Sequence, residues 1–229
     1  MDVEKPKIFE TLTKTENANI DYAKSVYPNR ILLYQEGCNL LGDVIKEIAS
    51  SFTNRKEAED KDVAVIALCN RILGTSKVVY ELSIRGYQFD TMILVRSLYE
   101  NFLVLNYVQR SASNTQKWLE AKVRLPTIVK ELSLSSDKEL RDFYFSISDY
   151  AHVNFEAIIT LMKPQDKNHT INISIEPRGL ADKQNFLPNF WANVLEFLSK
   201  HYKQLIKTET LTKISKLVKE ADSLSELFR

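Results

Sequence analysis

Residues 89–110, FDTMILVRSLYENFLVLNYVQR, decide the fold that this sequence predicts. Between Thr91 and Val108, twelve of the eighteen residues are apolar or aromatic, and the only charged side chains are those of Arg96 and Glu100. A helix that is apolar on every side belongs in the middle of a helical bundle, where other helices cover it. We therefore predict an all-α fold with this helix near its centre.

The segments on both sides carry helical patterns as well. From residue 21 to residue 52, apolar side chains recur in steps of three and four, which marks one face of a long amphipathic helix. Pro28 suits the first turn of that helix, and a second helix over about 62–85 should end at Gly86. Further helices are expected over 111–134 (one or two, the second opened by Pro126), 136–164, 188–207 and 209–227.

Two segments depart from the helical pattern. Residues 1–18 are polar and lack periodicity, so we expect a loose N-terminal arm. Ile171, Ile173 and Ile175 alternate with polar residues, which predicts one short extended strand near 170–176. No repeat or low-complexity tract marks a domain boundary. We expect residues 19–229 to form a single multi-helix bundle of about seven helices.

The composition narrows the function. A net charge of +1 creates no overall positive field that would attract nucleic acid or an anionic membrane. The chain has only five glycines, which argues against a glycine-rich phosphate-binding loop. Cys38 and Cys69 occupy apolar-periodic positions and predict neither a disulfide nor a zinc site. No stretch reaches the roughly 18 apolar residues of a membrane helix. We expect a soluble cytoplasmic protein without metal, cofactor or membrane contact.

Arg96 and Glu100 are the strongest anomaly in the sequence. At positions i and i+4 they share one face of the most apolar helix, and a buried charge is costly unless it is paired. One interpretation is an ion pair that fixes the helix register. The other is a polar site inside the bundle, extended by Tyr107 on the same side of the helix.

His152 is the second candidate. Ser148, His152 and Glu156 fall at steps of four residues on one helix face, with Asp149 one position off that face. A carboxylate beside an imidazole can orient its tautomer and raise its pKa, as a general base requires. A surface histidine on an ordinary helix gives the same pattern. We expect catalysis or ligand binding if His152 faces Arg96 and Glu100.

The stretch 200–219 is basic. It holds six lysines against Glu209 alone. One interpretation is a solvated helix face, and the other is a surface for a nucleic-acid backbone or a protein partner. The candidate nucleic-acid contacts are Lys203, Lys207, Lys213 and Lys216.

The segment Arg96-Ser97-Leu98-Tyr99-Glu100-Asn101, with Ser148-Asp149-Tyr150-Ala151-His152 downstream, resembles an uncharacterised family of prokaryotic all-helical proteins. The likeness covers roughly residues 35–160. That family is loosely similar to the HEPN superfamily and to AbiV-type abortive-infection proteins. The resemblance implies a role in phage defence or a toxin–antitoxin system, and it implies metal-independent RNA cleavage in some members. HEPN ribonucleases carry Arg-x(4–6)-His, whereas ten residues separate Arg141 from His152 here.

Three hypotheses follow. The leading one is a helical interaction or regulatory protein, as a homodimer or with another protein, because no complete catalytic motif is present. The second is a HEPN-like ribonuclease in which His152 is the base and Arg96 stabilises the phosphate. The third is a small-molecule sensor with a pocket lined by Arg96, Tyr107 and Trp118.

Overall fold

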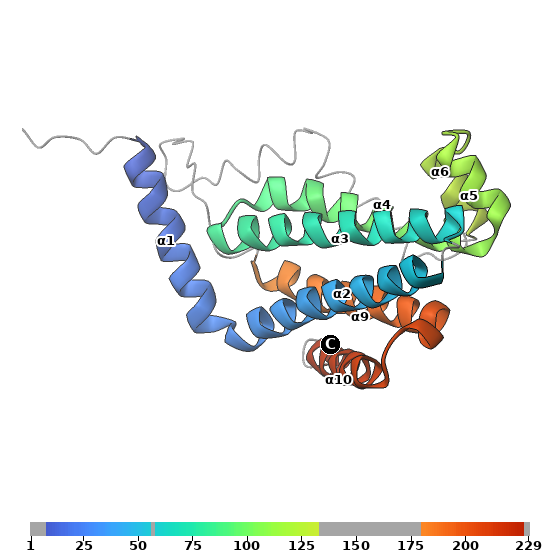
Figure 1. Ribbon diagram of the computed structural model, residues 1–229. Coiled ribbons are helices and arrows are strands. Elements are labelled where there is room, and N and C mark those ends of the chain that lie inside the picture. Colours follow the sequence, from blue (N-terminus) through green and yellow to red (C-terminus); the bar gives the residue numbers. More distant parts are fainter. Residues whose placement is uncertain (1–7, 56–57, 133–179, 227–229) are drawn as a thin grey trace, which may run out of the picture.

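The computed structural model describes residues 8–55, 58–132 and 180–226, and within these ranges the fold is all-α, as the sequence predicts (Figure 1). The described part contains eight α-helices, one short 3₁₀ turn and no strand. The helices are α1 (Ile8–Val26), α2 (Pro28–Arg55), α3 (Asp60–Arg85), α4 (Gln88–Arg110), α5 (Ala112–Leu119), α6 (Leu125–Glu131), α9 (Leu180–Tyr202) and α10 (Thr208–Glu226), with the 3₁₀ turn η3 at Lys203–Leu205.

The hairpin of α3 and α4 is closed by the glycine that the sequence singles out. Gly86 has φ of 96°, in the left-handed region that glycine enters without steric cost. Its amide donates to the carbonyl of Ser83, and the amide of Tyr87 donates to the carbonyl of Leu82 at 2.9 Å. These bonds satisfy the last carbonyls of α3 in the manner of a Schellman motif. The predicted helix end at Gly86 is confirmed.

The helices stack in layers, with α3 and α4 above α2 and α9, and with α10 against the far side of α2 and α9 (Figure 1). One continuous hydrophobic core joins the layers. Trp191 of α9 is fully buried and lies directly against Gly37 of α2. Other fully buried side chains of this core include Leu41, Ile48, Ile72, Leu98, Leu105, Leu195 and Leu198.

Helix α1 shows where the sequence-based prediction fails at the N-terminus. Residues 8–18, assigned to a loose arm, belong to this helix, and residues 1–7 lie outside the described part. The bundle-facing side of α1 includes Glu16 and Asn19, so apolar periodicity does not reveal it. The helix stands obliquely at one end of the molecule and packs on α3 and α2 through a small separate cluster around Ala23 and Ile84 (Figure 1).

Two other boundaries differ from the predicted ones. Helix α9 begins at Leu180, so Pro188 lies inside it and does not mark its start. A proline inside a helix removes one amide donor and crowds the carbonyl four residues earlier, so it can remain there only at a cost. The same helix ends at Tyr202 rather than near Lys207, because η3 interrupts it. The expected helix over 136–164 and the expected strand near 170–176 lie outside the described residues.

Among the described helices, α3 is the one long and apolar enough to cross a membrane. Length and composition alone support that possibility. The same helix packs against α4, α2 and α1 and contributes Val65, Leu68 and Ile72 to the core, as the central helix of a bundle does.

Candidate functional site

The predicted pair of Arg96 and Glu100 is formed. Arg96 Nε donates to Glu100 Oε1 at 2.8 Å across one turn of α4. The pair does not lie at the centre of the bundle, because 24% of the Arg96 side chain and 30% of the Glu100 side chain are exposed. An i,i+4 pair at this exposure contributes only about 0.3–0.5 kcal/mol to stability. Both charged groups are in contact with solvent, as their exposure shows. The small gain in stability does not by itself explain why the apolar helix carries them.

Helix α4 is consequently less enclosed than its composition suggests. Its inner side buries Leu98 and Leu105 completely, whereas Ile93, one turn before Arg96, is 46% exposed. The expectation that α4 is covered on every side is wrong. Apolar content reports how hydrophobic a helix is, but it does not report how many neighbours the helix has.

Tyr107 lies on the inner, buried side of α4. Its side chain is fully buried, and its hydroxyl has no hydrogen-bond partner among the described residues. Burial, together with the negative charge of Glu131, raises the pKa of Tyr107, so the phenol is neutral. Tyr107 lies eleven positions after Arg96 on the helix, or about 16 Å along its axis. Trp118 is partly buried and packs at the edge of the core. A pocket shared by the three side chains stays a prediction.

His152, Ser148 and Asp149 lie outside the described residues. Their predicted position beside Arg96 and Glu100 therefore stays a prediction. Within the described residues, no group of three or more histidine, cysteine, aspartate and glutamate side chains is arranged to hold a metal ion.

The lysines of 200–219 are surrounded by more acidic side chains than the sequence count indicates. Lys213 Nζ lies 2.8 Å from Glu209 Oε1, and this pairing raises the pKa of Lys213. Lys216 Nζ lies 3.5 Å from Glu220 Oε1. Lys207 Nζ is 3.9 Å from Glu47 of α2, which no count along α10 could include. Lys203 is exposed in η3.

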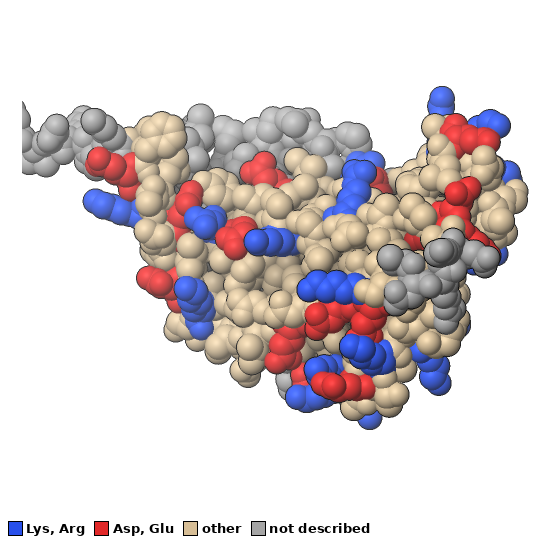
Figure 2. All heavy atoms as spheres, viewed as in Figure 1, with Lys and Arg blue, Asp and Glu red and all other residues tan. Residues whose placement is uncertain are grey.

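The visible molecular surface agrees with this local picture. Figure 2 shows lysine and arginine side chains interspersed with aspartate and glutamate over the face that it presents, with no broad field of one sign. A nucleic-acid backbone is attracted by a continuous basic face. The predicted contacts of Lys203, Lys207, Lys213 and Lys216 with nucleic acid therefore depend on lysines of which three already have acidic neighbours.

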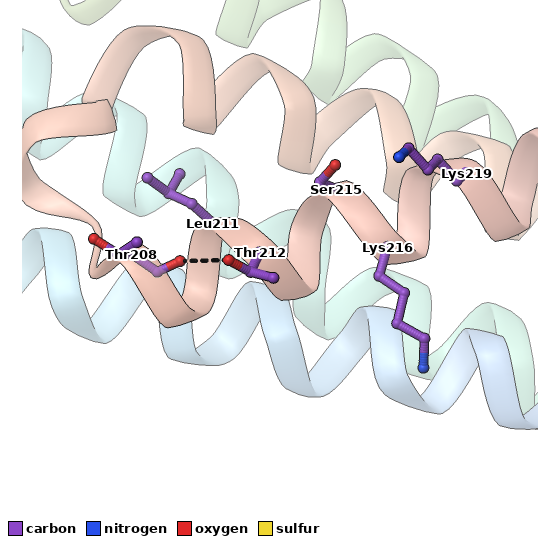
Figure 3. A pocket seen from close by; sticks show the side chains of 6 residues that line it. All are labelled: Thr208, Leu211, Thr212, Ser215, Lys216 and Lys219. Atoms are coloured by element: carbon purple, nitrogen blue, oxygen red, sulfur yellow. Dashed lines mark hydrogen bonds between the residues drawn. The ribbon is translucent and has the colours of Figure 1, made fainter.

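A shallow groove runs along the outer side of α10 (Figure 3). Its volume is about 470 Å³. The Thr212 hydroxyl donates to the Thr208 carbonyl at 3.0 Å, so that donor is used within the helix. The groove is lined by Thr208, Leu211, Thr212, Ser215, Lys216 and Lys219. Because all six residues belong to one helix, the groove is a depression of the surface and does not enclose a ligand.

Glu47 fixes the position of α10 and was missed by sequence reasoning. Its carboxylate accepts the backbone amide of Lys207 at 2.8 Å and the hydroxyl of Thr210 at 2.9 Å. A side chain of α2 thus caps the first turn of a helix that lies 160 residues further along the chain. Local sequence patterns cannot show a cap supplied from so far away.

A second polar cluster holds α1 against the turn between α3 and α4. Arg85 Nη1 lies 3.1 Å from Glu16 Oε2, and the Tyr87 hydroxyl donates to the other oxygen of the same carboxylate. The Asn19 amide donates to the Arg85 carbonyl at 3.0 Å. The hydrogen bond from Tyr87 and the charge of Arg85 lower the pKa of Glu16. We call Glu16, Arg85 and Tyr87 the α1 clamp.

Comparison with protein families gives a match over part of the chain. Residues 62–125 match a family of unknown function, DUF5677. The matched segment covers a little over a quarter of the chain and includes nearly all of α3, the whole of α4 and α5, and hence Arg96 and Glu100. No curated protein and no solved structure matches the chain. The match agrees with the expectation of an uncharacterised family. It covers residues 62–125 and carries no function with it.

Proposed function

We propose that this chain is a cytoplasmic helical interaction protein with a regulatory role, acting through contacts of its surface helices. The supporting observation is where its apolar surface is concentrated. Nine large apolar side chains of the described residues are exposed, and four of them, Ile8, Phe9, Tyr22 and Val26, belong to α1. A fifth, Leu32, lies in the second turn of α2, beside the elbow between the two helices.

This distribution is unlike that on the remaining surface. Single exposed apolar residues are normal on soluble proteins, and those of α3, α4 and α5 fit that description. Several on one short helix and its elbow form the kind of surface that partner proteins cover. Phe9, at 79% exposure, gains nothing from the fold of its own chain. We propose that Phe9 contacts another molecule.

The biological setting is part of the same proposal. The Arg-x-x-x-Glu helix and the downstream Ser-x-x-x-His segment resemble an uncharacterised family of prokaryotic helical proteins, and that family is loosely similar to proteins of phage-defence systems. We place the regulatory role in such a system, either toxin–antitoxin or abortive infection. An interaction protein in this setting acts by binding a partner and shifting the population of its active state.

The test compares two surfaces of equal apolar character. Phe9→Ser with Leu32→Ser removes exposed side chains at the α1 end, and Val63→Ser with Leu119→Ser removes side chains that are 56% and 50% exposed elsewhere. Each variant is expressed at the natural level in its host, cross-linked and analysed by mass spectrometry. We expect partner cross-links with the natural chain and the second variant, and their loss with the first. Identical cross-links in all three would overturn the proposal.

A metal-independent ribonuclease is the second candidate function. The observation in its favour is the partial exposure of Arg96, which leaves a guanidinium within reach of a phosphate. The purified chain is incubated with labelled single-stranded RNA beside His152→Ala and Arg96→Lys variants. Cleavage that both substitutions reduce at least about a hundredfold supports the enzyme, since general-base catalysis contributes that much. Equal cleavage by all three, or none, counts against it.

A further inference from the structure

Helix α1 has three sides with different chemistry. One side packs on α3 and α2 and includes Asn19 and Ala23, both buried. A second side is charged and solvent-exposed, with Lys14 and Asp21 at the edge next to the third side. The third side carries no charged residue. An ordinary surface helix needs only an inner apolar side and an outer polar side.

The uncharged side follows a regular spacing. Its members recur in alternating steps of three and four, which is the 3.5-residue period of helices that pair with another helix along their length. Ile8 is 66% exposed and Tyr22 is 45% exposed, while Thr15 is half-buried. The full set is Ile8, Thr11, Thr15, Ala18, Tyr22 and Ser25, with Val26 beside the last. We call this set the α1 seam.

The seam is suited to burial although two of its members are threonines. The Thr15 hydroxyl donates to the Thr11 carbonyl at 3.0 Å within the helix. Covering Thr15 therefore leaves its hydroxyl donor satisfied. The Tyr22 ring is already positioned by an edge contact with Tyr27, at 6.5 Å between ring centres. Little side-chain freedom is lost when a partner covers it.

Charge identifies the occupant as a second copy of this chain. When two copies of the seam pair antiparallel about a two-fold axis, Thr15 of one copy faces Ala18 of the other, and Ile8 faces Ser25. Small residues then occupy the centre, where the helices approach most closely. In the same register Lys14 of each copy lies beside Asp21 of the other, which gives two opposite-charge pairs by symmetry. In a parallel pair Lys14 would instead face Asn19 of the other copy, which is uncharged, and the two opposite-charge pairs would not form.

We propose that the α1 seam binds the seam of a second copy of this chain, antiparallel, with Lys14 and Asp21 paired across the interface. This inference rests on the proposed function and names one partner for it. Helix α1 has 19 residues and is about 28 Å long. An interface confined to such a helix falls below the usual size of stable dimers, so the dissociation constant belongs in the micromolar range.

Analytical ultracentrifugation of the purified full-length chain over about 1–300 μM tests the proposal, a range chosen to span micromolar binding. We expect a concentration-dependent dimer. Lys14→Glu and Asp21→Lys should each weaken it about tenfold, since each turns two attractions into repulsions. The double variant, Lys14→Glu with Asp21→Lys, should restore it. Lys130→Glu, an equal charge change on exposed α6 at the opposite end of the molecule, should leave it unchanged (Figure 1).

The outcomes separate this inference from the proposed function. A monomer throughout the concentration range overturns the inference. A dimer that the single reversals do not weaken, or that the double variant does not restore, overturns the seam register. Circular dichroism of every variant shows whether α1 remains helical. Because Phe9 and Leu32 are outside the seam, cellular cross-links that depend on those two residues would support the interaction role even if the chain proved monomeric.

Discussion

At the scale of single residues, two glycines within helices make opposite predictions. A Cβ atom at Gly37 would lie 3.0 Å from Cγ of Trp191, which is fully buried. We expect Gly37→Ala to lower the free energy of unfolding by about 1–3 kcal/mol through overpacking, partly offset by the better helix propensity of alanine. Fluorescence-monitored urea unfolding measures the change.

Gly74 of α3 is the matched control, because a Cβ atom there would meet no atom within 4 Å. We expect Gly74→Ala to raise the free energy of unfolding by about 0.5–1 kcal/mol, since alanine loses less backbone entropy than glycine in a helix. An increase for both substitutions would show that Trp191 does not constrain Gly37.

The two thiols make a second residue-scale prediction. Burial raises the pKa of Cys38 to about 11 and that of Cys69 to about 12. Both stay protonated in the folded chain, so a thiol reagent at pH 8 should label Cys38 slowly and Cys69 only after unfolding. Unfolded thiols ionise near pH 8.5, so the unfolded state binds fewer protons above that pH and stability falls as pH rises toward 11. Labelling of Cys69 as fast as that of free cysteine would contradict this.

Arg96 and Glu100 show how far residue-level prediction reaches. Their pairing could be predicted, because residues four apart on a helix meet through local geometry alone. Their exposure could not, because it depends on which neighbours cover α4. The unsatisfied hydroxyl of the buried Tyr107 is equally beyond the sequence, since burial comes from segments distant along the chain.

At the scale of elements, α10 depends on a residue of α2. Removing the Glu47 carboxylate leaves the amide of Lys207 and the hydroxyl of Thr210 without their acceptor. We expect Glu47→Ala to cost about 0.5–2 kcal/mol, the usual range for losing a helix cap, and to speed amide hydrogen exchange in the first turns of α10. Glu36→Ala, an exposed residue of the same helix, should change neither quantity. Unchanged exchange in Glu47→Ala would mean that apolar packing alone holds α10.

Helix ends set by local chemistry were the predictable ones. Gly86 and Pro28 mark a helix end and a helix start through their own backbone preferences, and both predictions are confirmed. The early part of helix α1 was not predictable, because its inner side uses Glu16 and Asn19, whose partners are Arg85 of α3 and Tyr87 of the following turn. The start of α9 was missed for the converse reason, since Pro188 is tolerated inside that helix.

At the scale of the whole molecule, the sequence predicts the all-α class because apolar periodicity is a property of each helix. The packing of the helices against one another depends on contacts between distant segments, which the periodicity of one helix does not show. The basic stretch 200–219 looked uncompensated along the chain, yet Glu47 of α2 lies beside Lys207 once α2 and α10 pack together. A surface made by two segments can be evaluated only after the fold brings them together.

The packing of α1 on the rest of the bundle predicts that the molecule unfolds in two stages as pH falls, with α1 separating first. Helix α1 belongs to a small cluster separate from the main core, and the α1 clamp links it to the α3–α4 turn. The clamp lowers the pKa of Glu16 below its ordinary value of 4.5, so its stabilisation is present above pH 4.5 and is lost as pH falls through the lower, folded value. We expect α1 to separate below about pH 4.5 while the main core persists.

Nuclear magnetic resonance spectra of the full chain between pH 7 and pH 3 would follow this loosening. Signals of α1 should shift or broaden before those of core residues such as Leu98 and Leu105. The isosteric variant Glu16→Gln cannot form the charged clamp, so its α1 should be loosened at pH 7 already and respond little to acid. The expectation fails if α1 and the core change together, or if the variant and the natural chain show the same acid transition. Either result would mean that the charge on Glu16 does not govern the attachment of α1.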